Sequence, residues 1–466
     1  MDGTARVLEN VTYEDLLVGQ SAHLQRQLTA EDIALFAALS GDLNPTHLDP
    51  DFARKTAQHE VIAHGMWAAA LVSAVLGTRL PGPGTIYLGQ TLTFDRPVRV
   101  GDTLTVVVSC AAKHGDGTAS FDCLCTNQRD ERVVYGVARV RAPTAKVQWP
   151  VTALPTVTVV DRHARLQRLI ARAGGIPPLS VAVVHPCDEP SLLGALLAQA
   201  AGLITPVLVG PRAKVVSTAL EHGLSLDGIE LVDVPHSHAA AARAVELARS
   251  GHVQALMKGS LHTDELLAAV LAREAGLRTG RRLSHVFWLD VPGHDRPLLI
   301  TDAAVNIEPT LEDKADIARN AIEFALALGI EKPRVAVLAA VETVNPRMRA
   351  TLDSAALCKM ADRGQIVGAR VDGPLAFDNA ISAVAARIKG IRSEVAGAAD
   401  ILLVPDLESG NMLAKQLEYL GHALSGGIVL GARVPILLTS RADPADSRLA
   451  SCALAALLMA RRGLHP

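Results

Sequence analysis

The pattern of hydrophobic residues in this chain of 466 residues changes once, at the proline-containing stretch 143–155. Before it, a very apolar helical segment at about 64–76 is followed by strand-like runs that Gly/Asp turns separate. After it, short apolar strands alternate with helical segments. The chain is too long for one hydrophobic core, so we interpret the change as a domain boundary. We expect a first domain at 1–145, a linker at 146–160 and a second domain at 161–466.

The two parts predict different fold classes. One long apolar helix with antiparallel strands after it is an α+β arrangement. Alternating short strands and helices predict a doubly wound α/β sheet, in which the strands are buried on both faces. Aromatic residues make up only 3% of the chain, so the core must be aliphatic, which suits buried parallel strands. Because the second part is long for a single layer, we expect two lobes with a cleft between them.

Composition and missing motifs exclude several classes of function. The formal net charge of −3 gives no basic field for nucleic acid. The glycine patterns of dinucleotide sites and of P-loops are both missing, and no apolar run reaches the length of a membrane span. Six scattered cysteines without a CxxC pair suit a reducing compartment. We therefore expect a cytoplasmic protein with no nucleic-acid partner, no membrane contact, no metal and no permanently bound cofactor.

The first candidate site is the loop 40–47, which reads SGDLNPTH. Adding water to a double bond beside a thioester needs a base for the water, an acid for the α-carbon and donors for the enolate oxygen. Asp42 and His47 suit the acid and base, and Asn44 can orient one of them. The amide of Gly65 suits the oxyanion donor because it opens the apolar helix, where N–H groups are free. An ordinary turn is the alternative interpretation of this loop.

The runs SGDLNPTHLDPDFA and VIAHGMWAAALVSAVLG resemble the MaoC-like, R-specific enoyl-CoA hydratases over residues 10–142. The resemblance implies a hot-dog fold, in which a sheet wraps a long central helix. It also implies acid/base roles for Asp42 and His47, and contact of the Gly65 amide with the thioester oxygen. Thr46 stands where an aliphatic residue is usual in that family. Hot-dog domains usually pair to complete a site, so a homo-oligomer is implied as well.

The second candidate site follows an apolar strand-like run and reads SRADPAD at 440–446. Polar loops after the strands of α/β sheets are where such folds build sites. Acyl transfer between CoA and phosphate needs a base for the thiol, donors for the oxyanion and a phosphate ligand. Asp446 could act as the base, and Ser440 could contact the sulfur or the oxyanion. Arg441 could bind the phosphoryl oxygens with its two-pronged guanidinium group. A helix N-cap is the alternative interpretation, because Ser and Asp often precede an apolar helix.

Several segments of the second part occur in the same order in one known family. They are LMKG at 256–259 followed by Thr263, TDAAVN at 301–306, VDGPL at 371–375, DN at 378–379, VPD at 404–406 and LTSRAD at 438–443. Through them, residues 160–466 resemble the phosphate acetyl/butyryltransferases, with the butyryl branch the closer. The resemblance implies a two-lobed, isocitrate/isopropylmalate dehydrogenase-like architecture and catalysis by Ser440, Arg441 and Asp446. The ligand-binding residues we expect from it are Lys258, Thr263, Asp302, Asn306, Asp372, Asp378 and Asn379.

One departure from that family concerns phosphate. Acetyl-transferring relatives carry a phosphate-binding arginine a few residues after the position of Thr263, whereas this chain has LLAA at 266–269. Arg273, Arg278 and Lys258 are the candidate substitutes.

The sequence thus predicts a bifunctional acyl-CoA enzyme. The first domain would interconvert a 2-enoyl-CoA and a (3R)-hydroxyacyl-CoA, and the second would exchange CoA for phosphate on an acyl group. CoA thioesters and phosphate are then substrates rather than cofactors. Two alternatives stay open. In one, only the hydratase is active and the second domain binds CoA esters or holds an oligomer together. In the other, the chain is an acyl-CoA sensor without turnover.

Overall fold

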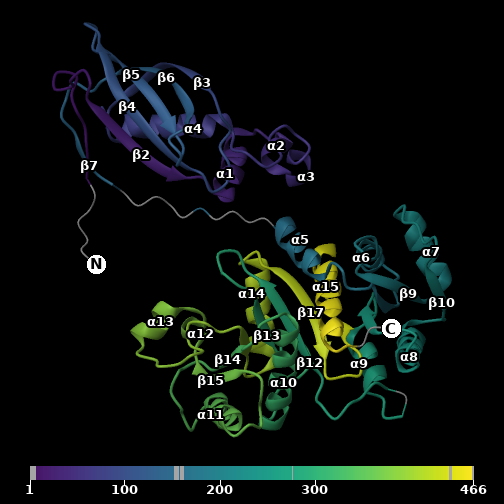
Figure 1. Ribbon diagram of the computed structural model, residues 1–466. Helices are drawn as coiled ribbons and strands as arrows, with labels where there is room; N and C mark the ends of the chain where they lie inside the picture. The colour runs from purple at the N-terminus through teal and green to yellow at the C-terminus, as the bar shows by residue number, and fades with distance from the viewer. Residues whose placement is uncertain (1–6, 152–156, 158–161, 275, 440–442, 464–466) are drawn as a thin grey trace. The chain divides into compact units, whose positions relative to one another are not determined.

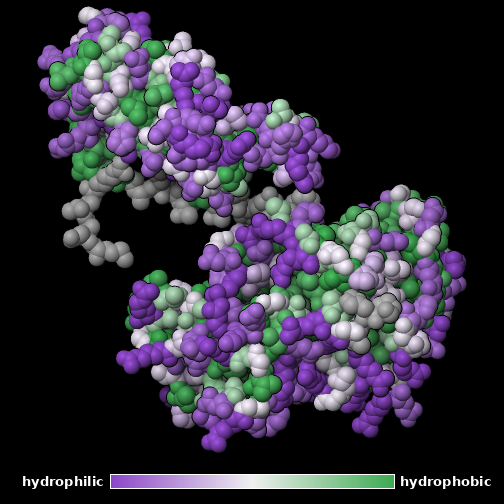
Figure 2. Space-filling model, viewed as in Figure 1, coloured by the Kyte–Doolittle hydropathy of each residue, from purple (hydrophilic) through white to green (hydrophobic). Residues whose placement is uncertain are grey.

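The computed structural model describes residues 7–151, 157, 162–274, 276–439 and 443–463. The chain divides into two compact units, 1–159 and 160–466 (Figure 1). Figure 2 shows hydrophilic residues over much of the visible face of each unit, with groups of hydrophobic residues among them. In the part of the chain that the structure describes, every helix falls short of the length and apolarity that a membrane crossing requires.

The N-terminal unit contains a five-stranded antiparallel sheet in the order β2-β4-β5-β6-β3. Along most of β4 every second residue is buried, as expected of a strand with one face on the core. The elements are β1 (Val7–Glu9), β2 (Ser21–Gln27), α1 (Ala30–Ser40), α2 (Pro45–Leu48), α3 (Pro50–Ala53), α4 (Gly65–Thr78), β3 (Ile86–Phe94), β4 (Thr103–Lys113), β5 (Thr118–Thr126), β6 (Arg132–Arg141) and β7 (Gln148–Pro150).

Helix α4 supplies the other half of the core of this unit. It contacts β2, β3 and β4, and it lies along the sheet in Figure 1. Trp67, Val72 and Val75 of α4 are buried against strand residues such as Val106 and Phe121. A long apolar helix packed on one face of an antiparallel sheet is the arrangement expected of a hot-dog fold.

The N-terminal unit extends past the predicted boundary at residue 145. Residues 148–150 form β7, which pairs antiparallel with β1 at the start of the described chain. The Val147 amide also donates a hydrogen bond to the Asn10 side chain at 2.9 Å. The first residues of the predicted linker 146–160 therefore belong to this unit, and 152–156 and 158–160 lie outside the described residues.

The C-terminal unit is built on one continuous sheet of eleven strands, in the order β10-β9-β8-β11-β18-β17-β12-β13-β16-β14-β15. The first five are parallel to one another, and so are the last four. Between the two groups, β17 and β12 pair antiparallel with each other and with their outer neighbours.

The strands of this sheet are connected mostly by helices. The elements are α5 (Arg162–Ala173), β8 (Leu179–Val184), α6 (Glu189–Ala200), β9 (Ile204–Gly210), α7 (Arg212–Glu221), β10 (Glu230–Asp233), α8 (Ser237–Arg249), β11 (Ala255–Lys258), α9 (Thr263–Leu271), β12 (Ser284–Asp290), β13 (Leu298–Thr301), α10 (Leu311–Ala327), β14 (Arg334–Leu338), α11 (Arg349–Asp362), β15 (Arg370–Leu375), α12 (Phe377–Ile381), α13 (Ala383–Ile388), β16 (Ile401–Leu403), α14 (Leu407–Tyr419), β17 (Leu424–Leu430), β18 (Ile436–Leu437) and α15 (Ala445–Arg461).

One face of this sheet carries a single hydrophobic core and the other face carries two. Val183 of β8 and Val286 of β12 share a core with residues of α5, α6, α10 and α15. Because side chains alternate along a strand, their neighbours face the other way. There, Val184 packs with residues of α8 and α9, whereas Phe287 packs with residues of α12 and α14. The two expected lobes therefore share one hydrophobic core on one face of the sheet and have separate cores on the other face. That this architecture is isocitrate/isopropylmalate dehydrogenase-like stays a prediction.

A glycine pair tests the packing of the N-terminal sheet. A methyl group at Gly136 of β6 would lie 1.9 Å from the Thr91 carbonyl oxygen on β3, whereas one at Gly89 meets nothing within 4 Å. We expect Gly136→Ala to lower the unfolding free energy by about 2 kcal/mol or more, because backbone must shift. Gly89→Ala should change it by less than about 1 kcal/mol. Thermal unfolding of the full chain measures both, and equal effects would contradict this packing.

Candidate active sites

The loop after α1 places Asp42, Asn44 and His47 on one short turn. Gly41 ends α1 with a φ of 75°, a left-handed conformation that glycine adopts without strain. The Asn44 side chain caps α2 by accepting a hydrogen bond from the Thr46 amide at 3.1 Å. The Asn44 main-chain amide donates to the Asp42 carboxylate at 3.2 Å. Asn44 therefore orients Asp42 through its backbone, while its side chain shapes the turn.

Two main-chain carbonyl groups fix which nitrogen of each nearby histidine carries a proton. His47 Nδ1 lies 2.8 Å from the Ile62 carbonyl oxygen, and His64 Nε2 lies 3.1 Å from the Asp42 carbonyl oxygen. A carbonyl oxygen only accepts, so both of these nitrogens donate. In the neutral rings the other nitrogen then keeps a lone pair. Nε2 is therefore the nitrogen of His47 that is left to accept a proton.

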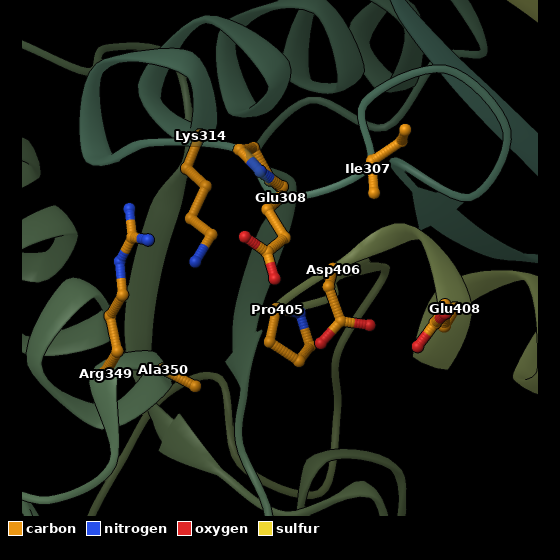
Figure 3. A pocket seen from close by; sticks show the side chains of 9 residues that line it. Ile307, Glu308, Lys314, Arg349, Ala350, Pro405, Asp406 and Glu408 are labelled. Atoms are coloured by element: carbon orange, nitrogen blue, oxygen red, sulfur yellow. The ribbon is translucent and has the colours of Figure 1, made fainter.

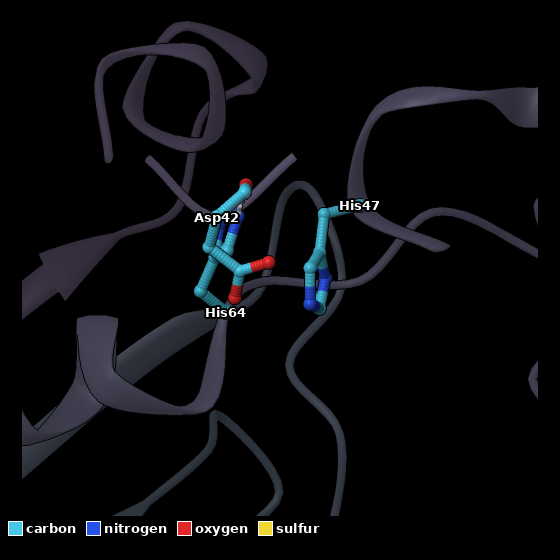
Figure 4. Close-up of side chains that lie close together, drawn as sticks. All are labelled: Asp42, His47 and His64. Atoms are coloured by element: carbon cyan, nitrogen blue, oxygen red, sulfur yellow. Dashed lines mark hydrogen bonds between the residues drawn. The ribbon is translucent and has the colours of Figure 1, made fainter. Parts of the chain in front are cut away.

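Asp42, His47 and His64 form one cluster (Figure 4). One donor atom from each side chain lies within 4.8 Å of the other two, an arrangement that could hold a metal ion and that equally suits acid/base work. The two imidazole rings lie 4.0 Å apart between centroids. His64 is 2% exposed, and its Nδ1 has no hydrogen-bond partner among the described residues. Sequence reasoning missed His64; its position directly before the helix that Gly65 opens was the available signal.

A cavity of about 290 Å³ lies beside this cluster. His47, His64 and Gly65 line it, together with apolar side chains such as Phe94. Helix α4 begins at Gly65 without a side-chain cap, so amides at this end are available to a ligand. A Cβ at Gly65 would lie 3.2 Å from the Phe94 ring, and glycine thus keeps the helix start accessible. The structure therefore places Asp42 near His47, and His47 and Gly65 on one cavity.

In the C-terminal unit, a cavity of about 460 Å³ lies between the two hydrophobic cores that cover one face of the sheet. Leu261 on one wall belongs to the core with α8 and α9, and Phe287 on another belongs to the core with α12 and α14. Lys258 and Thr263 are the predicted ligand residues that line this cavity. We call it the transfer cavity below.

Lys415 of α14 connects two carboxylates at the transfer cavity. Its Nζ lies 2.7 Å from Glu418 and 3.2 Å from Asp443. Asp443 is 6% exposed and lines the transfer cavity, whereas Glu418 lines a neighbouring cavity of about 160 Å³. Burial opposes the charge of Lys415, but the hydrogen bond to Glu418 and the charge of Asp443 raise its pKa. Lys415 therefore stays a cation at neutral pH.

His285 of β12 also lines the transfer cavity and was missed from the sequence, where it reads as one residue of an apolar strand. It is fully buried, and neither ring nitrogen has a hydrogen-bond partner among the described residues. Its ring contacts Phe287 edge-on, with 4.4 Å between centroids. Burial lowers the pKa of His285 to about 4, so the imidazole is neutral at physiological pH.

Two predicted ligand residues, Asp302 and Asn306, form hydrogen bonds within the turn after β13. The buried Asp302 carboxylate accepts hydrogen bonds from the amides of Ala304, Val305 and Asn306. The Asn306 side chain donates to Asp302 and to the Leu283 carbonyl oxygen. Burial raises the pKa of Asp302, while these donors counteract it. These hydrogen bonds stabilise the turn, and ligand binding by Asp302 and Asn306 stays a prediction.

Three further predicted ligand residues lie at the edge of the sheet, on β15 and α12. The Asp372 carboxylate accepts a hydrogen bond from the adjacent Gly373 amide, and Asp378 pairs with Lys389 at the surface. Asn379 is buried and donates to Glu342 at 3.4 Å. The transfer cavity instead lies around β11, β12 and β18, so the structure does not bring Asp372, Asp378 or Asn379 to it.

The predicted catalytic loop is only partly described. Ser440 and Arg441 lie outside the described residues. Asp446 stands in the first turn of α15 and lines the smaller cavity with Glu418 and Ser447, not the transfer cavity. Because Ser440 and Arg441 lie outside the described residues, the catalytic role expected of Asp446 stays a prediction.

Other charged cavities lie apart from these sites. Of the three candidate substitutes for the phosphate arginine, Lys258 lines the transfer cavity, Arg278 lines a separate cavity of about 520 Å³ and Arg273 is exposed. Another cavity, of about 260 Å³, lies at the starts of α11 and α14, and Figure 3 shows side chains that line it. Lys314 and Glu308 point into it, but Lys314 already pairs with Asp353 at 2.7 Å.

Two family models match the chain. One described as Phosphate acetyl/butaryl transferase matches residues 235–456, and one described as MaoC like domain matches residues 18–123. The chain is 62% identical to the phosphate acetyltransferase of Rhizobium meliloti over 299 residues, covering 64% of this chain and 95% of that protein. It is 46% identical to the phosphate butyryltransferase of Clostridium acetobutylicum over 278 residues, covering 60% and 92%. The butyryl branch is thus not the closer of these two.

One solved structure is similar to the C-terminal part of the chain. It is a branched-chain phosphotransacylase from Enterococcus faecalis V583, at 31% identity, with a TM-score of 0.54. The match covers 60% of this chain and 98% of that one.

The buried His285 predicts a loss of stability in acid. Its pKa is about 4 in the folded chain, against about 6.5 for an unfolded histidine. Below pH 6.5 the unfolded chain takes up a proton that the folded chain does not. The unfolding free energy should therefore fall by about 3 kcal/mol between pH 6.5 and 4 on this account. His285→Gln should remove that part of the slope in urea unfolding; identical slopes for both proteins would contradict it.

Proposed function

We propose, from the premise that this chain belongs to the phosphate acetyl/butyryltransferase family, that its C-terminal unit exchanges CoA for phosphate on an acyl group in the transfer cavity. The observation that carries this proposal is the meeting of Lys258, Thr263, Lys415 and Asp443 around one cavity. Phosphate and the tetrahedral oxyanion are both anionic, and buried cations stabilise them.

The transfer cavity offers a replacement for the missing arginine. Lys258 lines it at the end of β11, and Lys415 lines it from α14. Helix α9 begins at Thr263 on the wall of the cavity, and its N-cap residue His262 makes no side-chain cap. Two lysines and free helix amides are a usual set of phosphate ligands. The arginine is therefore not required for phosphate binding here.

For the N-terminal unit, we propose reversible hydration of a 2-enoyl-CoA to a (3R)-hydroxyacyl-CoA. Asp42 and His47 share the two proton transfers, and His47 uses Nε2 because its Nδ1 is tied to Ile62. The Gly65 amide at the start of α4 receives the thioester oxygen as enolate charge develops. The MaoC like match over 18–123 supports this assignment, since it spans Asp42, His47 and Gly65.

Both proposed activities act on acyl-CoA thioesters, which gives a chemical reason for the two units to occur in one chain. Identity of 62% to a phosphate acetyltransferase favours transfer over the alternative that this unit only binds CoA esters. The intact cluster of the N-terminal unit likewise favours turnover over a sensor. Homo-oligomer formation stays part of the proposal.

A cross-over experiment tests both assignments in the full chain. Crotonyl-CoA hydration is followed by loss of enoyl absorbance, and acyl transfer by thiol release from acetyl- and butyryl-CoA with phosphate. Asp42→Asn should lower hydration about 100-fold or more and leave transfer unchanged, and Lys258→Met should do the reverse. Hydration without thiol release in the wild-type chain would favour the binding-module alternative. Loss of both activities in either variant would contradict two separate sites.

His64 is expected to act as a positioning residue for hydration. His64→Phe keeps an aromatic ring against His47 but removes the hydrogen bond to the Asp42 carbonyl oxygen. We expect kcat to fall about 10-fold or more with KM within about threefold, because the loop that carries Asp42 loosens. His64→Gln can still donate there and should recover part of kcat. A thermal midpoint that falls equally in both variants, with no recovery, would indicate a purely structural role.

A further inference from the structure

The side chains of Asp42, His47 and His64 make up the ligand set of a transition-metal site (Figure 4). One donor atom from each lies within 4.8 Å of the other two, a separation that small side-chain rotations can close around one ion. Two imidazoles and one carboxylate suit zinc, whereas magnesium and calcium prefer oxygen ligands. We propose that these three side chains bind a divalent zinc ion, and that the bound ion blocks hydration. The second half of this inference rests on the hydration proposed above.

The main chain holds both histidines in the tautomers that metal binding requires. The Ile62 carbonyl oxygen fixes the proton of His47 on Nδ1, at 2.8 Å, and the Asp42 carbonyl oxygen fixes that of His64 on Nε2, at 3.1 Å. Histidines that bind a metal through one ring nitrogen usually donate the other N–H in this way, which orients the ring and makes the ligand more basic. His47 Nε2 and His64 Nδ1 are therefore the two nitrogen ligands, and the Asp42 carboxylate supplies an oxygen.

The buried nitrogen of His64 points independently to a ligand. The side chain is 2% exposed, and its Nδ1 has no hydrogen-bond partner among the described residues. A buried polar atom without a partner costs free energy, and a metal ion that uses its lone pair removes that cost.

The same cluster explains why a bound ion stops hydration. The proposed proton transfers need the Asp42 carboxylate and His47 Nε2, and both of these groups are zinc ligands in this site. An ion therefore occupies the acid and the base together, while His64 adds the third ligand.

The surroundings of the cluster tolerate a cation. Asp95 and Arg96 line the adjacent cavity, and they pair with Arg132 at 2.6 Å and with Glu131 at 3.8 Å. The uncapped start of α4 at Gly65 opposes a bare cation, but its amides can donate to a water or hydroxide that completes the coordination. The cavity of about 290 Å³ has room for that ligand.

Zinc binding is tested first by equilibrium dialysis of the chelator-treated full chain. Asp42→Asn and His64→Phe should each weaken binding of one zinc ion per chain by about 10-fold or more, because each removes one ligand. His23→Gln is the matched control, since it removes an exposed histidine of β2 outside the cluster, and it should bind zinc like the wild type. Cobalt in place of zinc should give d–d absorption without a thiolate charge-transfer band.

Hydration of crotonyl-CoA by the wild-type chain is then followed as zinc is added. The rate should fall about 100-fold or more when this ion is bound, because the acid and the base are both occupied. A chelator should restore it, and magnesium should leave it unchanged.

Equal zinc affinity in the wild type, Asp42→Asn and His64→Phe would overturn the site and indicate binding elsewhere on the chain. Unchanged hydration with the ion bound at the cluster would overturn the block. If His64→Phe unfolds, Asp42→Asn decides alone, because that carboxylate is exposed. A wild-type chain that hydrates no crotonyl-CoA would instead contradict the proposed hydratase, and the dialysis would still decide whether the site binds zinc.

Discussion

The antiparallel pairing of β12 with β17 joins the two halves of the C-terminal unit. Seven residue pairs connect Ser284–Asp290 to Leu424–Leu430. Two glycines of β17 let other elements pack closely on this strand: a Cβ at Gly426 would lie 2.7 Å from Leu454 of α15, and one at Gly427 would lie 2.3 Å from the Leu438 carbonyl oxygen. Without this pairing the two groups of parallel strands would form separate sheets. The cavity that opens between their cores would then not exist.

The two units place their acid/base groups by different physical means. In the N-terminal unit, hydrogen bonds from His47 and His64 to main-chain carbonyl groups fix the tautomers beside an exposed carboxylate. In the C-terminal unit, an ion pair between Lys415 and Asp443 sets the geometry in a buried wall. The first arrangement suits water as a reactant, because its carboxylate is open to solvent. The second suits a thiolate, because a cation is already in place.

The periodicity of apolar residues predicted much of the fold, and sequence motifs predicted part of each candidate site. Alternating short strands and helices predicted the doubly wound sheet, and the loop at 40–47 predicted that Asp42 and His47 lie close together. The pairing of β1 with β7 was missed, because it joins segments far apart in sequence. Whether Asp443 or Asp446 faces the transfer cavity depends on where α15 begins, a boundary that sequence patterns locate only within a few residues.

Polar residues at other positions show the same dependence on three-dimensional context. Asp302 and Asn306 are the polar residue types that bind ligands, but the same polarity satisfies the amides of a tight turn. His285 is one polar residue among apolar neighbours, so its burial depends on which face of β12 it occupies. Only the three-dimensional arrangement of both cores decides that.

In the function proposed above, one chain carries two independent acyl-CoA sites. Isothermal titration of the full chain with S-butyl-CoA, a thioether that cannot release an acyl group, tests it most directly. Two equivalents should bind per chain, whatever the oligomeric state. One equivalent per chain would contradict it.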